Sequence, residues 1–173
     1  MGVGVSMHRV STGDLPTAEL VQRLVTEAYE RYRTDDEGST SNVYPALAEV
    51  PADLFGICVV ATDGTVFAIG DWDLEFTIMS VSKPFVFALV CELLGADEAR
   101  RRLGVNSTGL PFDSLSAIER ADDGRTNPMV NAGAIAASSL APGATADAKW
   151  GFLHEGLSRF AGRALALDDV VYD

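Results

Sequence analysis

The segment Met79-Ser80-Val81-Ser82-Lys83-Pro84, followed by FVFALVCELL at 85–94, decides how the rest of the chain is interpreted. Residues 85–94 carry a single charge, so a helix here is apolar on nearly all sides and is expected to lie inside the fold. Pro84 has no N–H, which a helix tolerates in its first turn because those groups have no intrahelical partner. We therefore predict a helix that begins near Ser80 and ends at Gly95.

Ser80 and Lys83 stand three residues apart at the start of this helix, which places them on one face about one turn apart. Only Lys83 and Lys149 are lysines among the 13 basic residues, and an arginine could not give up its proton to serve as a base. The pair could therefore be a nucleophile and its general base at the positive end of a helix. Alternatively, Ser80 caps the helix and Lys83 extends into solvent.

The order of the predicted elements indicates an α+β fold, with helices packed on an antiparallel sheet. β-branched and aromatic residues fill 55–61 and 65–71, and Asp63-Gly64 between them predicts a β-hairpin. Alternating apolar residues at 74–79 predict a third strand. Apolar residues at helical spacing predict helices at about 17–33 and 146–161. A charged segment that stops at Gly104 predicts one at about 96–103, and a run of small residues predicts a closely packed one at 131–140.

The acidic composition narrows the classes of partner. Asp and Glu number 25 against 13 Lys and Arg, so the net charge is −12 and the surface repels phosphate backbones and anionic lipids. No uninterrupted apolar run reaches the length of a membrane span. We therefore expect neither a nucleic-acid partner nor a membrane partner.

The sequence offers no metal-binding pattern. The two histidines and the two cysteines are far apart, and Cys58 and Cys91 lie inside apolar runs typical of buried thiols. The first residues lack the pattern of a signal peptide, so we expect a reducing, cytoplasmic setting. A length of 173 residues fits one domain, 1–173, in which 1–16 are expected to be flexible.

Four motifs, concentrated between residues 43 and 140, resemble the serine-dependent glutaminase family, whose catalytic domain is similar to β-lactamases and penicillin-binding proteins. The resemblance implies a β-lactamase/transpeptidase-like fold and hydrolysis of L-glutamine to L-glutamate and ammonia through a Ser–Lys acyl-enzyme. It implies no metal or organic cofactor, and a homo-oligomer. The motifs are Tyr44-Pro45-Ala46-Leu47-Ala48, Ala61-Thr62-Asp63-Gly64 with Gly70-Asp71, Ser80-Val81-Ser82-Lys83-Pro84, and Asn127-Pro128-Met129-Val130-Asn131-Ala132-Gly133-Ala134-Ile135.

The resemblance also implies roles for individual side chains. Ser80 would be the nucleophile and Lys83 its base. The hydroxyl of Tyr44 would lie beside the substrate and the nucleophile, and Asn131 would hold the α-carboxylate or the amide of the substrate. Asn127 is expected to support the turn before Asn131.

The chain departs from the family pattern after its last motif. The family's later substrate-binding residues and its Lys-Ser-Gly-like strand have no counterpart, because Lys149 precedes a tryptophan. We therefore expect an N-terminal part of the catalytic domain that is inactive unless another chain supplies the remainder. The alternatives are a non-catalytic glutamine- or glutamate-binding or regulatory module, and a penicillin-recognising acylase of the same fold.

Overall fold

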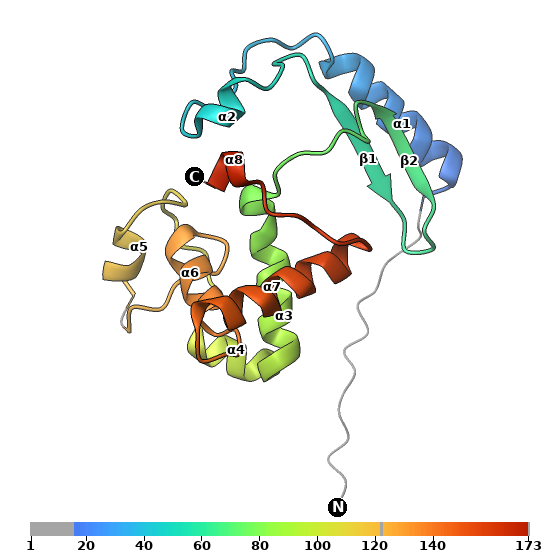
Figure 1. Cartoon of the computed structure of the whole chain (residues 1–173). Coiled ribbons are helices and arrows are strands. Elements are labelled where there is room, and N and C mark those ends of the chain that lie inside the picture. Colours follow the sequence, from blue (N-terminus) through green and yellow to red (C-terminus); the bar gives the residue numbers. More distant parts are fainter. Residues whose placement is uncertain (1–15, 122, 173) are drawn as a thin grey trace, which may run out of the picture. The chain divides into compact units, whose positions relative to one another are not determined.

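The computed structural model describes residues 16–121 and 123–172, which form two compact units (Figure 1). The first unit ends at Phe76, and the second comprises Thr77–Tyr172. The flexible start predicted for 1–16 lies outside the described residues, apart from Pro16. The assignment of 1–173 to one domain stays a prediction.

The sheet belongs to the first unit and is a hairpin. β1 (Gly56–Val60) pairs antiparallel with β2 (Val66–Gly70), and Cys58 lies opposite Ala68. The predicted hairpin is confirmed. The predicted third strand at 74–79 is wrong, since the described residues form only these two strands. Alternating apolar residues are compatible with an extended chain, but a strand also needs a neighbour for its backbone groups, and the sequence does not reveal that neighbour.

The turn between the strands shows why the hairpin was predictable. Gly64 has a φ of 88°, which a residue without a Cβ adopts at little cost. The Asp63 carboxylate accepts the Thr65 N–H at 2.9 Å. This hydrogen bond lowers the pKa of Asp63. The Asp-Gly pair therefore supplies both the backbone conformation and a local hydrogen bond.

One long helix packs against the hairpin. It is α1 (Ala18–Tyr32), and Thr17 caps its start by accepting the Leu20 N–H at 3.3 Å. The ring of Tyr29 stacks on that of Phe55, with centroids 5.4 Å apart. The predicted helix at about 17–33 is confirmed. A single turn, α2 (Pro45–Ala48), completes the regular structure of this unit.

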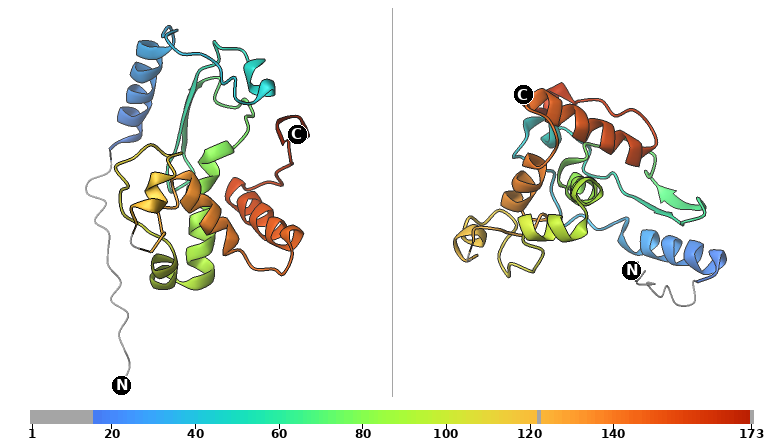
Figure 2. Two further views of the ribbon diagram at one scale, coloured as in Figure 1. Left: turned by 90° about the vertical axis from the view of Figure 1, so that its left-hand side faces the viewer. Right: turned by 90° about the horizontal axis from the view of Figure 1, so that it is seen from below.

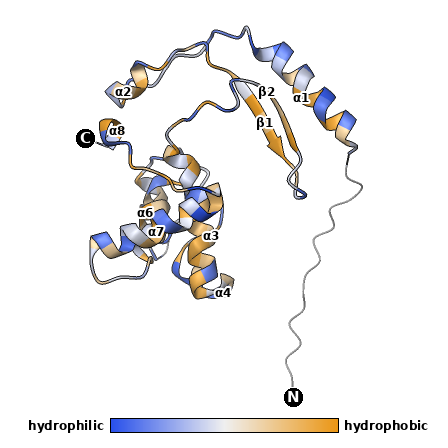
Figure 3. Ribbon diagram, turned by 45° about the vertical axis from the view of Figure 1, so that its right-hand side comes forward, coloured by the Kyte–Doolittle hydropathy of each residue, from blue (hydrophilic) through white to orange (hydrophobic). Residues whose placement is uncertain are grey.

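The second unit is built around α3 (Ser82–Leu94), which begins after a 3₁₀ turn, η1 (Met79–Val81). Figure 2 shows α3 with the other long helices around it, and its apolar colouring is clear in Figure 3. Those helices confirm the predictions at 96–103, 131–140 and 146–161. They are α4 (Ala96–Arg102), α6 (Asn131–Ser139) and α7 (Ala146–Ala161), and the short helices α5 (Ser116–Glu119) and α8 (Asp169–Tyr172) complete the unit.

The core of the second unit lies on one side of α3. Val86 and Val90 pack with Leu103 of the segment after α4 and Ala137 of α6. The face that carries Pro84, Ala88 and Glu92 is exposed, and near the end of the helix Leu93 is 44% exposed. The prediction that α3 is buried on nearly all sides therefore holds only for part of its surface.

Among residues 16–121 and 123–172, no single helix is long and apolar enough to cross a membrane. Met79–Leu94 and Ala96–Arg102 reach that length and apolar character only together, and the chain is bent by 115° at the break between them.

Candidate active site

Ser80 lies exposed in the 3₁₀ turn that leads into α3. The helical segment therefore begins where the sequence predicted, with Pro84 in the first turn of α3. The Ser82 hydroxyl donates to the Met79 carbonyl at 2.7 Å, so this second serine is engaged in the turn itself. The N-cap residues are Ile78 for η1 and Val81 for α3, so Ser80 occupies the cap position of neither helix.

The backbone immediately before Ser80 is strained. Met79 has a φ of 42°, and it is the only residue other than glycine with a positive φ in the described part of the chain. Such a conformation costs on the order of 1–3 kcal/mol for a residue with a Cβ. Strain of this kind gathers at functional sites, where it fixes the direction of a reactive side chain.

Lys83 joins the start of α3 to the start of α6. Its Nζ donates to Oδ1 of Asn131 at 2.6 Å, across 48 residues of sequence. An ammonium group only donates, so the acceptor that faces it must be the amide oxygen of Asn131. The two N–H groups of Asn131 Nδ2 are then directed elsewhere. Among the described residues, Lys83 makes no hydrogen bond to Ser80.

Phe112 contacts both members of this pair and was not identified from the sequence. Its ring centroid lies 5.6 Å from Lys83 Nζ, within cation–π range. Its backbone carbonyl accepts the Asn131 N–H at 2.8 Å. The one available clue was an aromatic residue in a Gly- and Pro-bearing loop, which by itself does not reveal a contact with α3.

Asn127 supports the turn before α6, as predicted. Its Oδ1 accepts the Met129 N–H at 2.8 Å, and its Nδ2 donates to the Asn106 carbonyl at 3.1 Å. A Cβ at Gly133 would lie 1.9 Å from the Asn127 carbonyl oxygen. The small residues after Asn131 therefore allow α6 to approach this turn closely.

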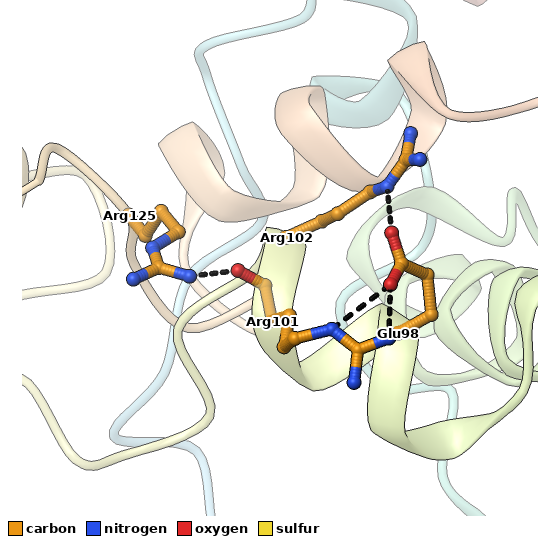
Figure 4. A network of polar contacts seen from close by, with 4 residues as sticks. All are labelled: Glu98, Arg101, Arg102 and Arg125. Carbon is orange, nitrogen blue, oxygen red and sulfur yellow. Dashed lines mark hydrogen bonds and ion pairs between the residues drawn. The ribbon is translucent and has the colours of Figure 1, made fainter.

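Charged side chains anchor the loop that leads to this turn (Figure 4). Arg125 donates to the Arg101 carbonyl at the end of α4. Glu98 accepts from Arg102 at 2.7 Å and from Arg101 Nε at 3.0 Å. The hydrogen bond from Arg102, followed by that from Arg101, lowers the pKa of Glu98. The Arg125 hydrogen bond therefore connects α4 to the loop before the Asn127 turn, while the Glu98 contacts lie within α4.

The predicted site residues fall in both units. Ser80, Lys83 and Asn131 belong to the second unit, and the structure brings Lys83 and Asn131 into direct contact. Tyr44 belongs to the first unit, where it precedes α2 and its side chain is exposed. Its role stays a prediction. No group of three or more His, Cys, Asp or Glu in 16–121 and 123–172 is arranged to hold a metal ion.

Comparison with known proteins identifies the family. The model of the glutaminase family matches residues 38–173. Glutaminase 2 of Yersinia pestis is 64% identical over 163 residues, which cover 94% of this chain and 48% of that protein. A glutaminase of Brucella abortus is 48% identical over 134 residues, covering 78% and 42%. This chain belongs to the glutaminase family.

Solved structures agree with this assignment. The probable glutaminase YbaS matches with a TM-score of 0.82 and 34% identity, over 89% of this chain and 50% of that one. The probable glutaminase from Bacillus subtilis complexed with 6-diazo-5-oxo-L-norleucine gives 0.67 and 29%, over 96% and 49%. The fold is accordingly the α+β, β-lactamase-like fold of glutaminases. The chain spans about half the length of the curated relatives it matches.

Proposed function

We propose that this chain carries the nucleophile half of an active site that hydrolyses L-glutamine to L-glutamate and ammonia. Family membership supports the reaction. The assignment of roles rests on one observation, the 2.6 Å hydrogen bond from Lys83 to Asn131 at the helix end that carries Ser80. Three polar side chains of the family motifs thus belong to one unit, with two of them in contact.

In this proposal Ser80 attacks the side-chain amide carbon of glutamine. Lys83, as a neutral amine, takes the hydroxyl proton and returns it to the leaving nitrogen when the C–N bond breaks. Ammonia leaves, and a glutamyl ester remains on Ser80. Water then attacks the ester, its proton passes through Lys83 to Ser80 Oγ, and L-glutamate is released. The cycle needs no metal or organic cofactor.

The Lys83–Asn131 contact suits both proposed roles. A neutral lysine has two N–H groups and one lone pair, so it can donate to Asn131 Oδ1 while the lone pair accepts a proton from Ser80. Asn131 keeps its two Nδ2 donors for the α-carboxylate or amide of the substrate. Tyr44 is proposed to bring its hydroxyl beside the substrate and Ser80.

The remaining substrate contacts are proposed to come from the part of the relatives that this chain does not cover. Comparing ammonia release by the 173-residue chain and by a chimera extended with the second half of Yersinia pestis glutaminase 2 tests this. We expect turnover in the chimera and none in the short chain alone. Equal turnover by a folded, monomeric short chain would contradict the division of the site.

The serine assignment has a matched control two residues away. In the chimera, Ser80→Ala should abolish ammonia release. Ser82→Ala should retain most of it, because the Ser82 hydroxyl donates to the Met79 carbonyl and is not proposed to touch the substrate. Retained release in the Ser80 variant would overturn the mechanism. Calorimetry that detects glutamine binding without turnover would instead indicate a binding module. Acylation by a labelled penicillin without glutamine turnover would indicate an acylase.

The setting and assembly are also proposals. The absence of a disulfide framework in the cysteine pattern supports a reducing, cytoplasmic setting, and the family resemblance supports a homo-oligomer. Sedimentation of the chimera tests the assembly, and a single monomeric species would contradict it.

A further inference from the structure

Phe112 contacts the Lys83–Asn131 pair through two different parts of itself. Its ring centroid lies 5.6 Å from Lys83 Nζ, which stands over the ring face, and its backbone carbonyl accepts the Asn131 N–H at 2.8 Å. It belongs to neither α3 nor α6. One loop residue is thus in contact with the side chain of Lys83 and with the backbone of Asn131.

Burial does not account for this aromatic side chain. Phe112 is 61% exposed and takes no part in the core cluster around Val86 and Val90. An exposed ring contributes little hydrophobic stabilisation, whereas an N–H group above its face, whether of an ammonium or of a neutral amine, is attracted by the negative charge of the π system. The distinguishing contact of the ring is therefore the one with Lys83.

The loop that carries Phe112 is itself held in place. The Thr108 hydroxyl makes two hydrogen bonds with Leu110. It donates to the Leu110 carbonyl at 3.3 Å and accepts the Leu110 N–H at 3.2 Å. The Ser114 N–H donates to the Pro111 carbonyl at 3.1 Å. Asn127 binds the same loop through the Asn106 carbonyl. The position of the ring is thus defined by contacts on both sides of it.

We propose that Phe112 is a positioning residue for Lys83, whose side-chain nitrogen it holds beside Asn131 through the face of its ring. The effect on catalysis rests on the proposed role of Lys83 as the base. A leucine at 112 would keep an apolar side chain but lose the π face, and a tyrosine would keep both. Phe112→Leu and Phe112→Tyr therefore form a matched pair.

The first test needs no activity. In the 173-residue chain labelled with ¹³C-lysine, only Lys83 and Lys149 give side-chain signals, and Lys149→Arg assigns them. Protons above an aromatic face resonate upfield, so Phe112→Leu should move the Lys83 signal downfield and leave that of Lys149 in place. Phe112→Tyr should keep the upfield position. An unchanged Lys83 signal in the leucine variant would overturn the proposal.

The second test uses the chimera with the remaining half of the domain. Phe112→Leu should lower kcat roughly two- to fivefold with little change in KM, and Phe112→Tyr should restore it. Equal kcat in the leucine variant and the unaltered chimera would overturn the catalytic part of the proposal. If the unaltered chimera releases no ammonia, the proposed function fails, while the lysine spectrum still decides whether Phe112 holds Lys83.

Discussion

The two ends of α6 (Asn131–Ser139) are each contacted by one of the two lysines, and the ends differ in what a cation does there. Lys149 donates to the Ser139 carbonyl at the C-terminal end, where helix carbonyls lack partners and a positive charge is favourable. Lys83 donates to Asn131 at the N-terminal end and itself lies in the first turn of α3, so it stands where helix dipoles disfavour a cation. Lys149 therefore stabilises the end of α6, whereas the charge of Lys83 is unfavourable for helix stability, as is common for a reactive group.

The largest expected effect separates the two lysines by activity. In the chimera, Lys83→Arg should lower kcat by about 10²–10⁴-fold, because arginine cannot act as a base. Lys149→Arg keeps a donor for the Ser139 carbonyl and should stay within about twofold. Ammonia release under saturating glutamine measures both. Comparable kcat values in the two variants would remove the distinction between the ends of α6.

The next effect concerns the stability that depends on the close packing of Gly133, near the N-terminal end of α6, against the Asn127 turn. Gly133→Ala should destabilise the second unit by roughly 1–3 kcal/mol, since its Cβ would collide with the Asn127 carbonyl. The control is Gly151→Ala in α7, where no atom lies within 4 Å and alanine should stabilise by about 0.5–1 kcal/mol. Urea unfolding of the 173-residue chain gives both values. A neutral Gly133 variant would contradict the packing of α6 on this turn.

A smaller effect is the change in stability when either lysine is replaced by methionine, which should differ between the two ends of α6. Lys149→Met removes the donor to the Ser139 carbonyl and should destabilise the chain by about 1 kcal/mol. Lys83→Met relieves a cation at two helix starts, and water can satisfy the exposed Asn131 amide, so the variant should be no less stable than the unaltered chain. Thermal unfolding measures the pair. Greater destabilisation from Lys83→Met would make Lys83 a structural lysine like its counterpart.

The smallest expected effect lies in the charged network on α4. Because the folded-state pKa of Glu98 is lowered, its contribution to stability is present above the unfolded value of about 4.3 and is lost as pH falls further. Glu98→Gln should therefore show a shallower loss of stability than the unaltered chain below about pH 5. Urea midpoints across this range measure it. Parallel curves would show that Glu98 does not contribute.

Local chemistry explains what could be predicted of the fold. Local sequence patterns identified the longer helices but not the short α2, α5 and α8, and the Asp63-Gly64 pair identified the hairpin, because each of these patterns depends on neighbours in the sequence. The prediction of a strand at 74–79 was wrong because strand formation depends on a partner elsewhere in the chain. Burial around α3 was overestimated for the same reason, since covering Leu93 requires residues that its own apolar pattern does not specify.

The candidate site, too, could be predicted from the sequence only in part. The spacing of Ser80 and Lys83 predicts only that they share one helix face, and their roles, like that of Asn131, came from the family motifs. The contact between Lys83 and Asn131 spans 48 residues and depends on how α6 packs against α3, so no local pattern contains it. Phe112 was missed because its importance lies in a loop conformation fixed by other segments.

The central claim is that Ser80, at the helix start shared with Lys83, forms a covalent bond to the substrate. Rapid acid quenching of the chimera with glutamine, followed by mass spectrometry of the peptides, tests this directly. The account predicts a glutamyl group on Ser80, absent from Ser80→Ala and still present in Ser82→Ala. A glutamyl group on any other residue, or turnover in the Ser80→Ala variant, would contradict it.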